Sequence, residues 1–152
     1  MDLEEILKAR KSTRKFSGLK IDPEIITKGI SCGQKAPSAG ALRAYKYVAV
    51  ATKEKIEQIA GIARQEWIKD AGLIVVICVD PEKSGARYGN RGRNLYSIQD
   101  ATLFGSHLDL YFVSQGLGTC WVGSFNEEKI KKLLELDLRP ISLLVVGHKV
   151  KE

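Results

Sequence analysis

The residues best suited to binding chemistry are the cations that follow the first helical segment. The stretch Arg-Lys-Ser-Thr-Arg at 10–14 offers guanidinium, ammonium and hydroxyl groups close together, and these suit a phosphate dianion. Arg10 follows Leu3 by seven positions and Ile6 by four, so it continues the apolar face of that helix. A charge on that face needs an anionic or hydrogen-bonding partner. An alternative of equal weight is that these cations simply favour the dipole at a helix C-terminus.

No glycine-rich phosphate loop accompanies these cations. The sequence has neither a G-x-x-x-x-G-K-S/T motif nor a G-x-G-x-x-G motif after a strand, and Gly85, Gly89 and Gly92 fit neither pattern. If a nucleotide binds, side chains must therefore hold its phosphate.

Two further segments could approach a flat ligand. Ala-Pro-Ser-Ala-Gly at 36–40 is a rigid loop of small residues, although most such loops are plain connectors. The segment 116–123 contains Cys120 and Trp121, for which core packing is the favoured interpretation. A nucleophilic role for Cys120 is disfavoured, because no histidine or cation is evidently placed to lower its pKa.

Asp100 and His107 lie two turns apart on one predicted helix and could form a catalytic pair. Polar residues on a buried helix are more often internal hydrogen-bond partners, and no third member of a triad stands at an obvious spacing. The three cysteines are far apart and there are only two histidines, which argues against a disulfide framework or a metal site. We therefore predict no catalytic side chain and no metal ligand.

The elements that must position these residues follow from hydrophobic periodicity and start signals. Asp2 with Glu5, Asp22-Pro23, Thr52 and Asn126 are predicted to cap helix starts, and the polar stretch 80–93 is predicted to be a mobile loop. With no repeat or linker, residues 1–152 are predicted to form one domain, with a single sheet covered by helices in an α+β or α/β arrangement. The predicted helices span 2–10, 22–35, 52–61, 64–70, 94–115 and 126–136, and the predicted strands span 46–51, 73–79, 119–122 and 141–147.

Two helices carry apolar surface that must be covered. The helix 94–115 is apolar on nearly every side, so we expect it to be buried on nearly every side. In a small domain, one way to bury it is against a partner subunit. Leu3, Ile6 and Leu7 are expected to form the buried stripe of the first helix.

Composition limits the class of protein. Hydrophobic residues make up 44% and charged residues 28%, and no apolar run approaches the ~20 residues that span a bilayer, so no membrane partner is expected. The start MDLEEILKAR lacks the layout of a secretion signal, which predicts a cytoplasmic protein. The net charge of +6 favours an anionic partner, either nucleic acid or a phosphorylated small molecule.

Four segments together resemble the nitroreductase family of flavoproteins. They are KARKSTRKF at 8–16, APSAG at 36–40, the helix beginning IQDA at 98–101, and GLGTCWVGSF at 116–125, and they occur in family order along essentially the whole chain. The resemblance implies an α+β, nitroreductase-like fold with a central, mainly antiparallel sheet flanked by helices. It also implies an intertwined homodimer with FMN sites between the subunits.

The resemblance implies three groups of FMN-binding residues. Arg10, Lys11, Ser12 and Arg14 would bind the flavin phosphate and ribityl chain, joined by Lys149 or Lys151 after the last strand. Pro37, Ser38 and Ala39 of the other subunit would lie against the isoalloxazine ring. Trp121, Val122 and Gly123 would pack near the ring and donate backbone hydrogen bonds.

The implied activity is ping-pong electron transfer from NADH or NADPH to a small-molecule acceptor such as a nitroaromatic or a quinone. The segment 87–93 could shape the substrate entrance and meet a cofactor phosphate. Family members usually carry asparagine where this chain has Ala41, and Ala44 and Tyr45 replace a common proline–tryptophan pair. A flavin-binding or regulatory module with little turnover is therefore an alternative. A basic nucleic-acid-binding module is less favoured, because the cations are scattered and no binding motif is present.

Overall fold

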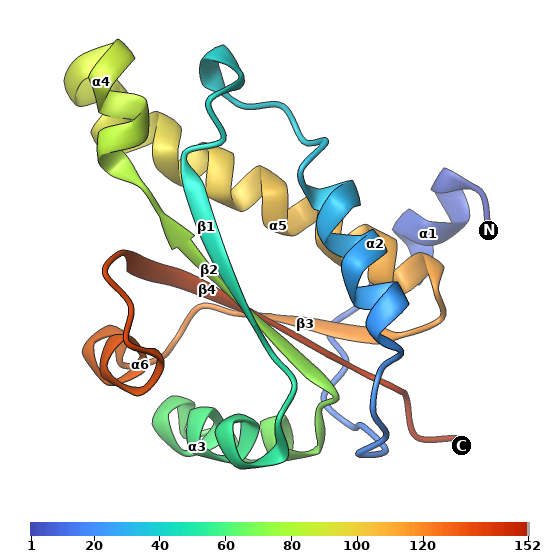
Figure 1. Cartoon of the computed structure of the whole chain (residues 1–152). Coiled ribbons are helices and arrows are strands. Elements are labelled where there is room, and N and C mark those ends of the chain that lie inside the picture. The colour runs from blue at the N-terminus through green and yellow to red at the C-terminus, as the bar shows by residue number, and fades with distance from the viewer. Residues whose placement is uncertain (152) are drawn as a thin grey trace.

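The computed structural model describes residues 1–151, which form three layers (Figure 1). The helices are α1 (Leu3–Ala9), α2 (Pro23–Gly33), α3 (Lys53–Ala63), α4 (Pro81–Arg91), α5 (Ser97–Ser114) and α6 (Glu127–Leu134), and the strands are β1 (Tyr45–Val50), β2 (Leu73–Val79), β3 (Gly118–Val122) and β4 (Arg139–Gly147). The strands form one sheet in the order β1-β2-β4-β3, and every neighbouring pair is antiparallel. Helices α2 and α5 lie on one face, and α3 and α6 lie on the other. The expected α+β fold with an antiparallel sheet is confirmed.

Strand β2 lies in the middle of the sheet and is buried on both faces. Leu73, Val75 and Ile77 pack into the core beneath α2 and α5, whereas Ile74 and Val76 pack into the core beneath α3 and α6. Successive side chains of a strand point to opposite faces, so a strand between two helix layers must be apolar at every position. Burial of each such side chain contributes roughly 1.5–3 kcal/mol to stability.

The predicted helix starts are confirmed at atomic detail. Glu5 N donates to Asp2 Oδ1 at 2.9 Å, and Asp2 N donates back to Glu5 Oε2 at 2.8 Å, which is a complete capping box. Asp22 caps α2 ahead of Pro23, and Asn126 caps α6. Thr52 stands at the start of α3 as predicted, but its side chain forms no capping hydrogen bond.

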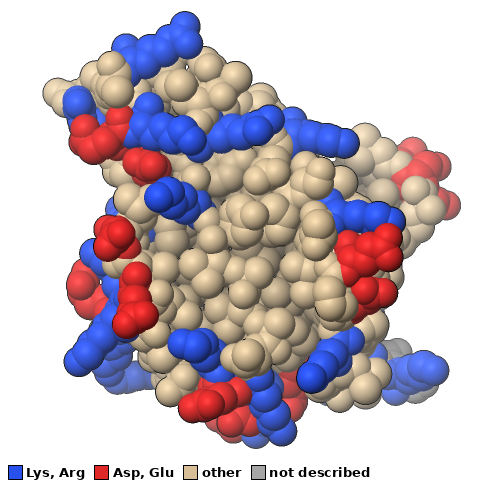
Figure 2. All heavy atoms as spheres, in the orientation of Figure 1, with Lys and Arg blue, Asp and Glu red and all other residues tan. Residues whose placement is uncertain are grey.

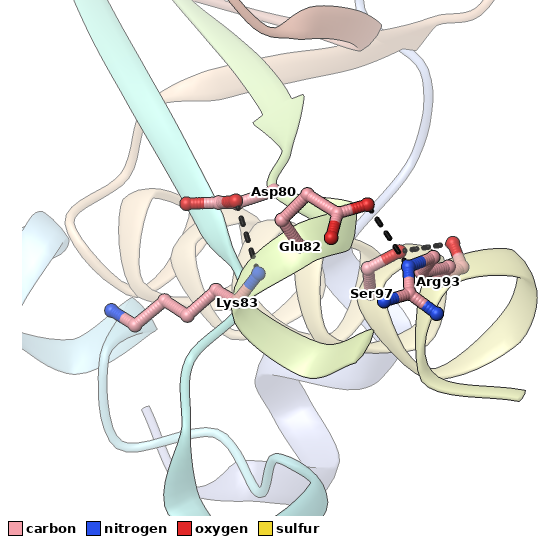
Figure 3. A network of polar contacts seen from close by, with 5 residues as sticks. All are labelled: Asp80, Glu82, Lys83, Arg93 and Ser97. Carbon is pink, nitrogen blue, oxygen red and sulfur yellow. Dashed lines mark hydrogen bonds and ion pairs between the residues drawn. The ribbon is translucent and has the colours of Figure 1, made fainter. Parts of the chain in front are cut away.

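The stretch 80–93 is not the loop that the sequence predicted, because it contains helix α4. Asp80 accepts from Lys83 N at 3.3 Å and Pro81 occupies the first turn, so the start is well capped despite the glycines that follow. Gly89, at φ 62°, breaks the helix, and a π-helical turn, Gly92–Tyr96, leads into α5. Figure 3 shows how Glu82 reaches Arg93 and how Ser97 bonds back to the Arg93 carbonyl, which ties α4 to the start of α5.

The predicted helix 64–70 is also wrong in part. Helix α3 runs on to Ala63, and Arg64 ends it in the left-handed conformation at φ 53°. A left-handed residue closes a helix, so only the short 3-10 turn Glu66–Asp70 follows.

Two expectations about burial fail within the single chain. Helix α1 contains no buried residue, and Leu3 and Leu7 are 65% and 54% exposed. Helix α5 is buried on its inner face only, and Ile98 and Leu103 stay partly open to solvent. The reason is that α1 packs mainly on one end of α5, and within residues 1–151 the outer sides of these two helices stay open to solvent.

Candidate functional site

The segment that follows α1 runs along the free edge of the sheet beside β3. Thr13 N donates to Thr119 O at 2.8 Å, and isolated bridges pair Ser12 with Thr119 and Phe16 with Lys149. A Cβ atom on Gly118 would lie only 2.7 Å from Thr13 Cγ2, so this close approach requires glycine at that position. The segment 10–14 and Lys149, which the resemblance assigned to one phosphate site, therefore lie on neighbouring stretches of chain.

The predicted cations of this segment point in different directions. Lys11 and Lys149 line one hollow of about 410 Å³, together with Thr13, Lys15 and Val150. Arg14 instead lies over the Trp67 ring, 6.0 Å from its centroid, on the side of the sheet covered by α3. The structure thus brings Lys11 and Lys149 together and adds Lys15, which the sequence analysis missed. Its signal was the spacing of Lys11, Thr13 and Lys15, since alternate residues of an extended chain share a side.

Arg10 lies toward the opposite helix layer, near a buried carboxyl group on α5. Asp109 is only 7% exposed, and burial raises its pKa above the ordinary value, although the Thr119 hydroxyl and the Arg10 charge act in the opposite direction. The hydroxyl is close to the carboxyl group but lacks the geometry of a hydrogen bond, and both Asp109 Oδ1 and Thr119 Oγ1 are buried without a partner. Asp109 is thus an anion that the sequence analysis did not connect with Arg10.

We expect Asp109→Asn to stabilise the fold at neutral pH. An acid whose pKa is raised by folding keeps its proton longer in the folded state, so its contribution is most favourable below the unfolded pKa and is lost as the pH rises through the folded pKa. Urea unfolding at pH 7 should give the variant a free energy of unfolding about 1 kcal/mol above the wild type. The gap should shrink as the pH falls toward about 4. The exposed acid replacement Asp137→Asn is the control, and a gap for Asp109→Asn that does not change with pH would contradict the assignment.

The loop 36–40 is held by Asp100. Its two carboxylate oxygens accept from Ala39 N at 3.1 Å and Ala44 N at 3.2 Å, and Asp100 itself is 2% exposed. The interpretation of Asp100 as an internal hydrogen-bond partner is confirmed, whereas His107 is exposed on α5 and forms no pair with it. Between the two bonded amides, Gly40, Ala41 and Arg43 adopt positive φ, 61°, 54° and 51°, so the turn is strained at Ala41 and Arg43.

The same loop lines a hollow of about 520 Å³. Pro37, Ser38 and Ala39 form one wall, and the outer side of α5, with Ile98 and Leu103, forms another. Along α5, Asp100 beside this hollow and Asp109 beside Arg10 are separated by nine residues, or roughly 14 Å of helix. The two main groups of predicted FMN-binding residues therefore lie at opposite ends of α5 and do not form one pocket within the chain.

The third predicted group lies at the far end of β3. The Trp121 ring is partly buried and packs against α5 at Gly105, where an added Cβ would lie in contact with the ring, so Trp121 packs at the margin of the core. Val122 is buried and Gly123 is exposed. Cys120 is 1% exposed within the other core, which agrees with a packing role.

The fold and the placement of these segments define an α+β protein with an antiparallel sheet between helix layers and a candidate binding face along α5. The family model described as "Nitroreductase family" matches residues 7–69 and 63–148. This chain therefore belongs to the nitroreductase family. None of the helices within residues 1–151 is long and apolar enough to cross a membrane.

Individual relatives agree with this membership. A nitroreductase family protein from Clostridium novyi NT has a similar structure, with a TM-score of 0.89, 28% identity, and coverage of 99% of this chain and 87% of that chain. A protein of Archaeoglobus fulgidus, provisionally named NADH dehydrogenase/NAD(P)H nitroreductase, is 28% identical over 148 residues, which are 94% of this chain and 82% of that protein. The FMN reductase (NADPH) of Bacillus subtilis is 26% identical over 162 residues, or 96% of this chain and 65% of that protein.

Proposed function

We propose that this chain is an FMN-dependent oxidoreductase that passes electrons from NADH or NADPH to a nitroaromatic, a quinone or a related acceptor, and that it works as a homodimer. The observation that carries the proposal is the arrangement along α5. A cation-rich segment lies at one end of this helix, and a largely apolar hollow beside the loop 37–39 lies at the other. A second copy could bring one chain's cations against the other chain's loop.

The residues present fit FMN. Lys11, Lys15 and Lys149 have no carboxylate within 4.0 Å among residues 1–151, so their charges are free to meet a phosphate. The hollow beside the loop 37–39 offers apolar walls to a flat ring, and Asp100 holds the loop through two hydrogen bonds from backbone amides. Rigid walls and fixed cations position a cofactor without a large ordering cost.

The apolar outer sides of α1 and α5 support the dimer. Leu3 and Leu7 on α1, and Ile98 and Leu103 on α5, are the exposed apolar residues of these two packed helices. Exposed apolar residues that gather on one face favour association with another surface. A partner subunit would cover these apolar side chains, which remain exposed in the single chain.

In this proposal FMN, when bound, supplies the redox chemistry by accepting a hydride from the nicotinamide and releasing electrons to the acceptor. The chain's residues bind and orient. The cations of 10–14 and Lys149 would hold the phosphate, and Pro37, Ser38 and Ala39 would limit access to the ring. Trp121, Val122 and Gly123 would define its other border. No side-chain acid or base is required by this division of roles.

The visible spectrum of the purified protein tests the proposal. We expect a yellow, dimeric protein whose flavin absorbance bleaches with NADH or NADPH under anaerobic conditions and returns when a quinone is added. A yellow protein that neither nucleotide bleaches would favour the flavin-binding module with little turnover, for which the replacement of the usual asparagine by Ala41 is the argument. A monomer that stays colourless after soaking with excess FMN would overturn the proposal.

A further inference from the structure

Two arginines of helix α4 contact residues at or next to the hollow beside the loop 37–39. A Cβ atom on Gly40 would lie 2.7 Å from Arg87 Nη1 and 2.6 Å from the Tyr88 hydroxyl, so Arg87 directly contacts the loop. Arg91 Nε donates to the hydroxyl of Tyr96 at 3.1 Å, and Tyr96 is itself a lining residue of the hollow. Arg87 therefore contacts the residue next to the lining residue Ala39, and Arg91 contacts the lining residue Tyr96 directly.

Aromatic rings hold these two arginines in place. Arg87 Cζ lies 5.3 Å from the Tyr88 ring centroid, and Arg91 Cζ lies 5.5 Å from that of Tyr96. The two rings meet edge to face with centroids 5.2 Å apart. Stacking on a ring restricts a long side chain, so less entropy is lost when it binds a ligand.

The charges of Arg87 and Arg91 are not neutralised within the described chain. The nearby carboxylate Glu82 pairs with Arg93 at 2.9 Å, and Figure 3 shows it turned toward that residue. No carboxylate of residues 1–151 lies within 4.0 Å of Arg87 or Arg91. Figure 2 shows a row of Lys and Arg side chains across the end of the molecule that carries α4. This surface therefore favours an anion.

We propose that Arg87 and Arg91 bind the phosphate monoester of a substrate that enters the hollow beside the loop 37–39. The guanidinium fork matches the oxygens of a phosphate, and two forks suit a dianion. The inference rests on the proposed function, because that function brings phosphorylated substrates to this hollow. Two sources share the chemistry: the 2′-phosphate of NADPH as electron donor, and the 5′-phosphate of free FMN as electron acceptor.

Equilibrium binding to the flavin-loaded protein tests the inference without turnover. One pair of probes is adenosine 2′,5′-bisphosphate against adenosine 5′-monophosphate, and the other is added FMN against riboflavin. In at least one pair, we expect the wild type to prefer the member with the extra phosphate by about tenfold or more. The double variant Arg87→Gln/Arg91→Gln should lose that preference, and Arg87→Lys/Arg91→Lys should keep part of it because the charge remains.

The matched control removes two exposed lysines from helices on the other face of the sheet. Lys55→Ala/Lys132→Ala lowers the net charge equally and should leave both preferences intact. A preference lost in the first pair identifies NADPH as the source, and one lost in the second pair identifies FMN. If neither preference exists, or if the glutamine variant weakens both members of a pair equally, the inference is overturned.

Anaerobic reduction by NADH and by NADPH separates this inference from the proposed function. If neither nucleotide reduces the flavin but the arginine-dependent phosphate preference is present, the proposed function fails and the binding site stands. If both nucleotides reduce the flavin and no preference depends on the arginines, the function stands and the binding site fails.

Discussion

Asp100→Ala is expected to lower the free energy of unfolding by about 2–4 kcal/mol, the largest loss from any single polar side chain of the site. Both carboxylate oxygens of Asp100 accept from backbone amides, those of Ala39 and Ala44, and alanine would leave both donors unpaired. Ala44 is fully buried, so water cannot replace the lost partner there. Urea unfolding followed by tryptophan fluorescence would measure the loss.

The loop should also loosen in this variant. Ala39 N is one of the two bonded amides, and Pro37, Ser38 and Ala39 line the hollow, so FMN affinity should fall along with stability. His107→Ala is the matched control, because His107 lies two turns further along the same helix and is exposed. Asp100→Asn should be intermediate, since its amide oxygen can serve one donor while its amino group opposes the other. If Asp100→Ala were as stable as His107→Ala, the hydrogen bonds of Asp100 would not be what stabilises the loop.

Asp100 illustrates what the sequence could predict and why. A carboxyl group on an apolar helix implied an internal hydrogen-bond partner, but its two acceptor bonds join residues 61 and 56 positions away, which no local pattern encodes. The strands were predictable because β2 and β4 are long apolar runs between helix layers. Helix α4 was missed because its glycines and polar residues predict a loop more strongly than Asp80-Pro81 predicts a helix start. In the structure, contacts with the start of α5 stabilise the helix.

The cations of 10–14 show a second kind of limit. Their composition indicated a phosphate site, but composition does not say which way each side chain points. Pairing with the edge of the sheet sets the side-chain directions, because Thr13 pairs with Thr119 and the chain around Thr13 is extended. Arg10 consequently lies toward α5, Arg14 lies over Trp67, and Lys11 faces Lys149. In the single chain these side chains therefore contact different parts of the molecule, which their order in the sequence does not indicate.

Arg10→Ala is expected to weaken FMN binding by ~1.5–3 kcal/mol, or roughly 10- to 150-fold in Kd. The reason is the loss of a charged hydrogen bond to the flavin phosphate, and Arg14→Ala is expected to have a similar effect. Titration of the apoprotein with FMN, followed by quenching of flavin fluorescence, gives Kd. Lys55→Ala, at an exposed position of α3 outside the segment, removes one charge and serves as the control.

Loss of FMN affinity in Arg10→Ala could come from a lost phosphate contact or from a disturbed fold, and a second substitution at Asp109 separates these two causes. Arg10 lies near this buried carboxyl group, so Arg10→Ala alone leaves Asp109 without its nearby cation. In the Asp109→Asn background that penalty is absent, and a loss of FMN affinity that persists there belongs to the phosphate. If Arg10→Ala and Arg14→Ala both bind FMN normally while Lys11→Ala/Lys149→Ala does not, the phosphate lies in the hollow of Lys11, Lys15 and Lys149, and the arginine assignment is wrong.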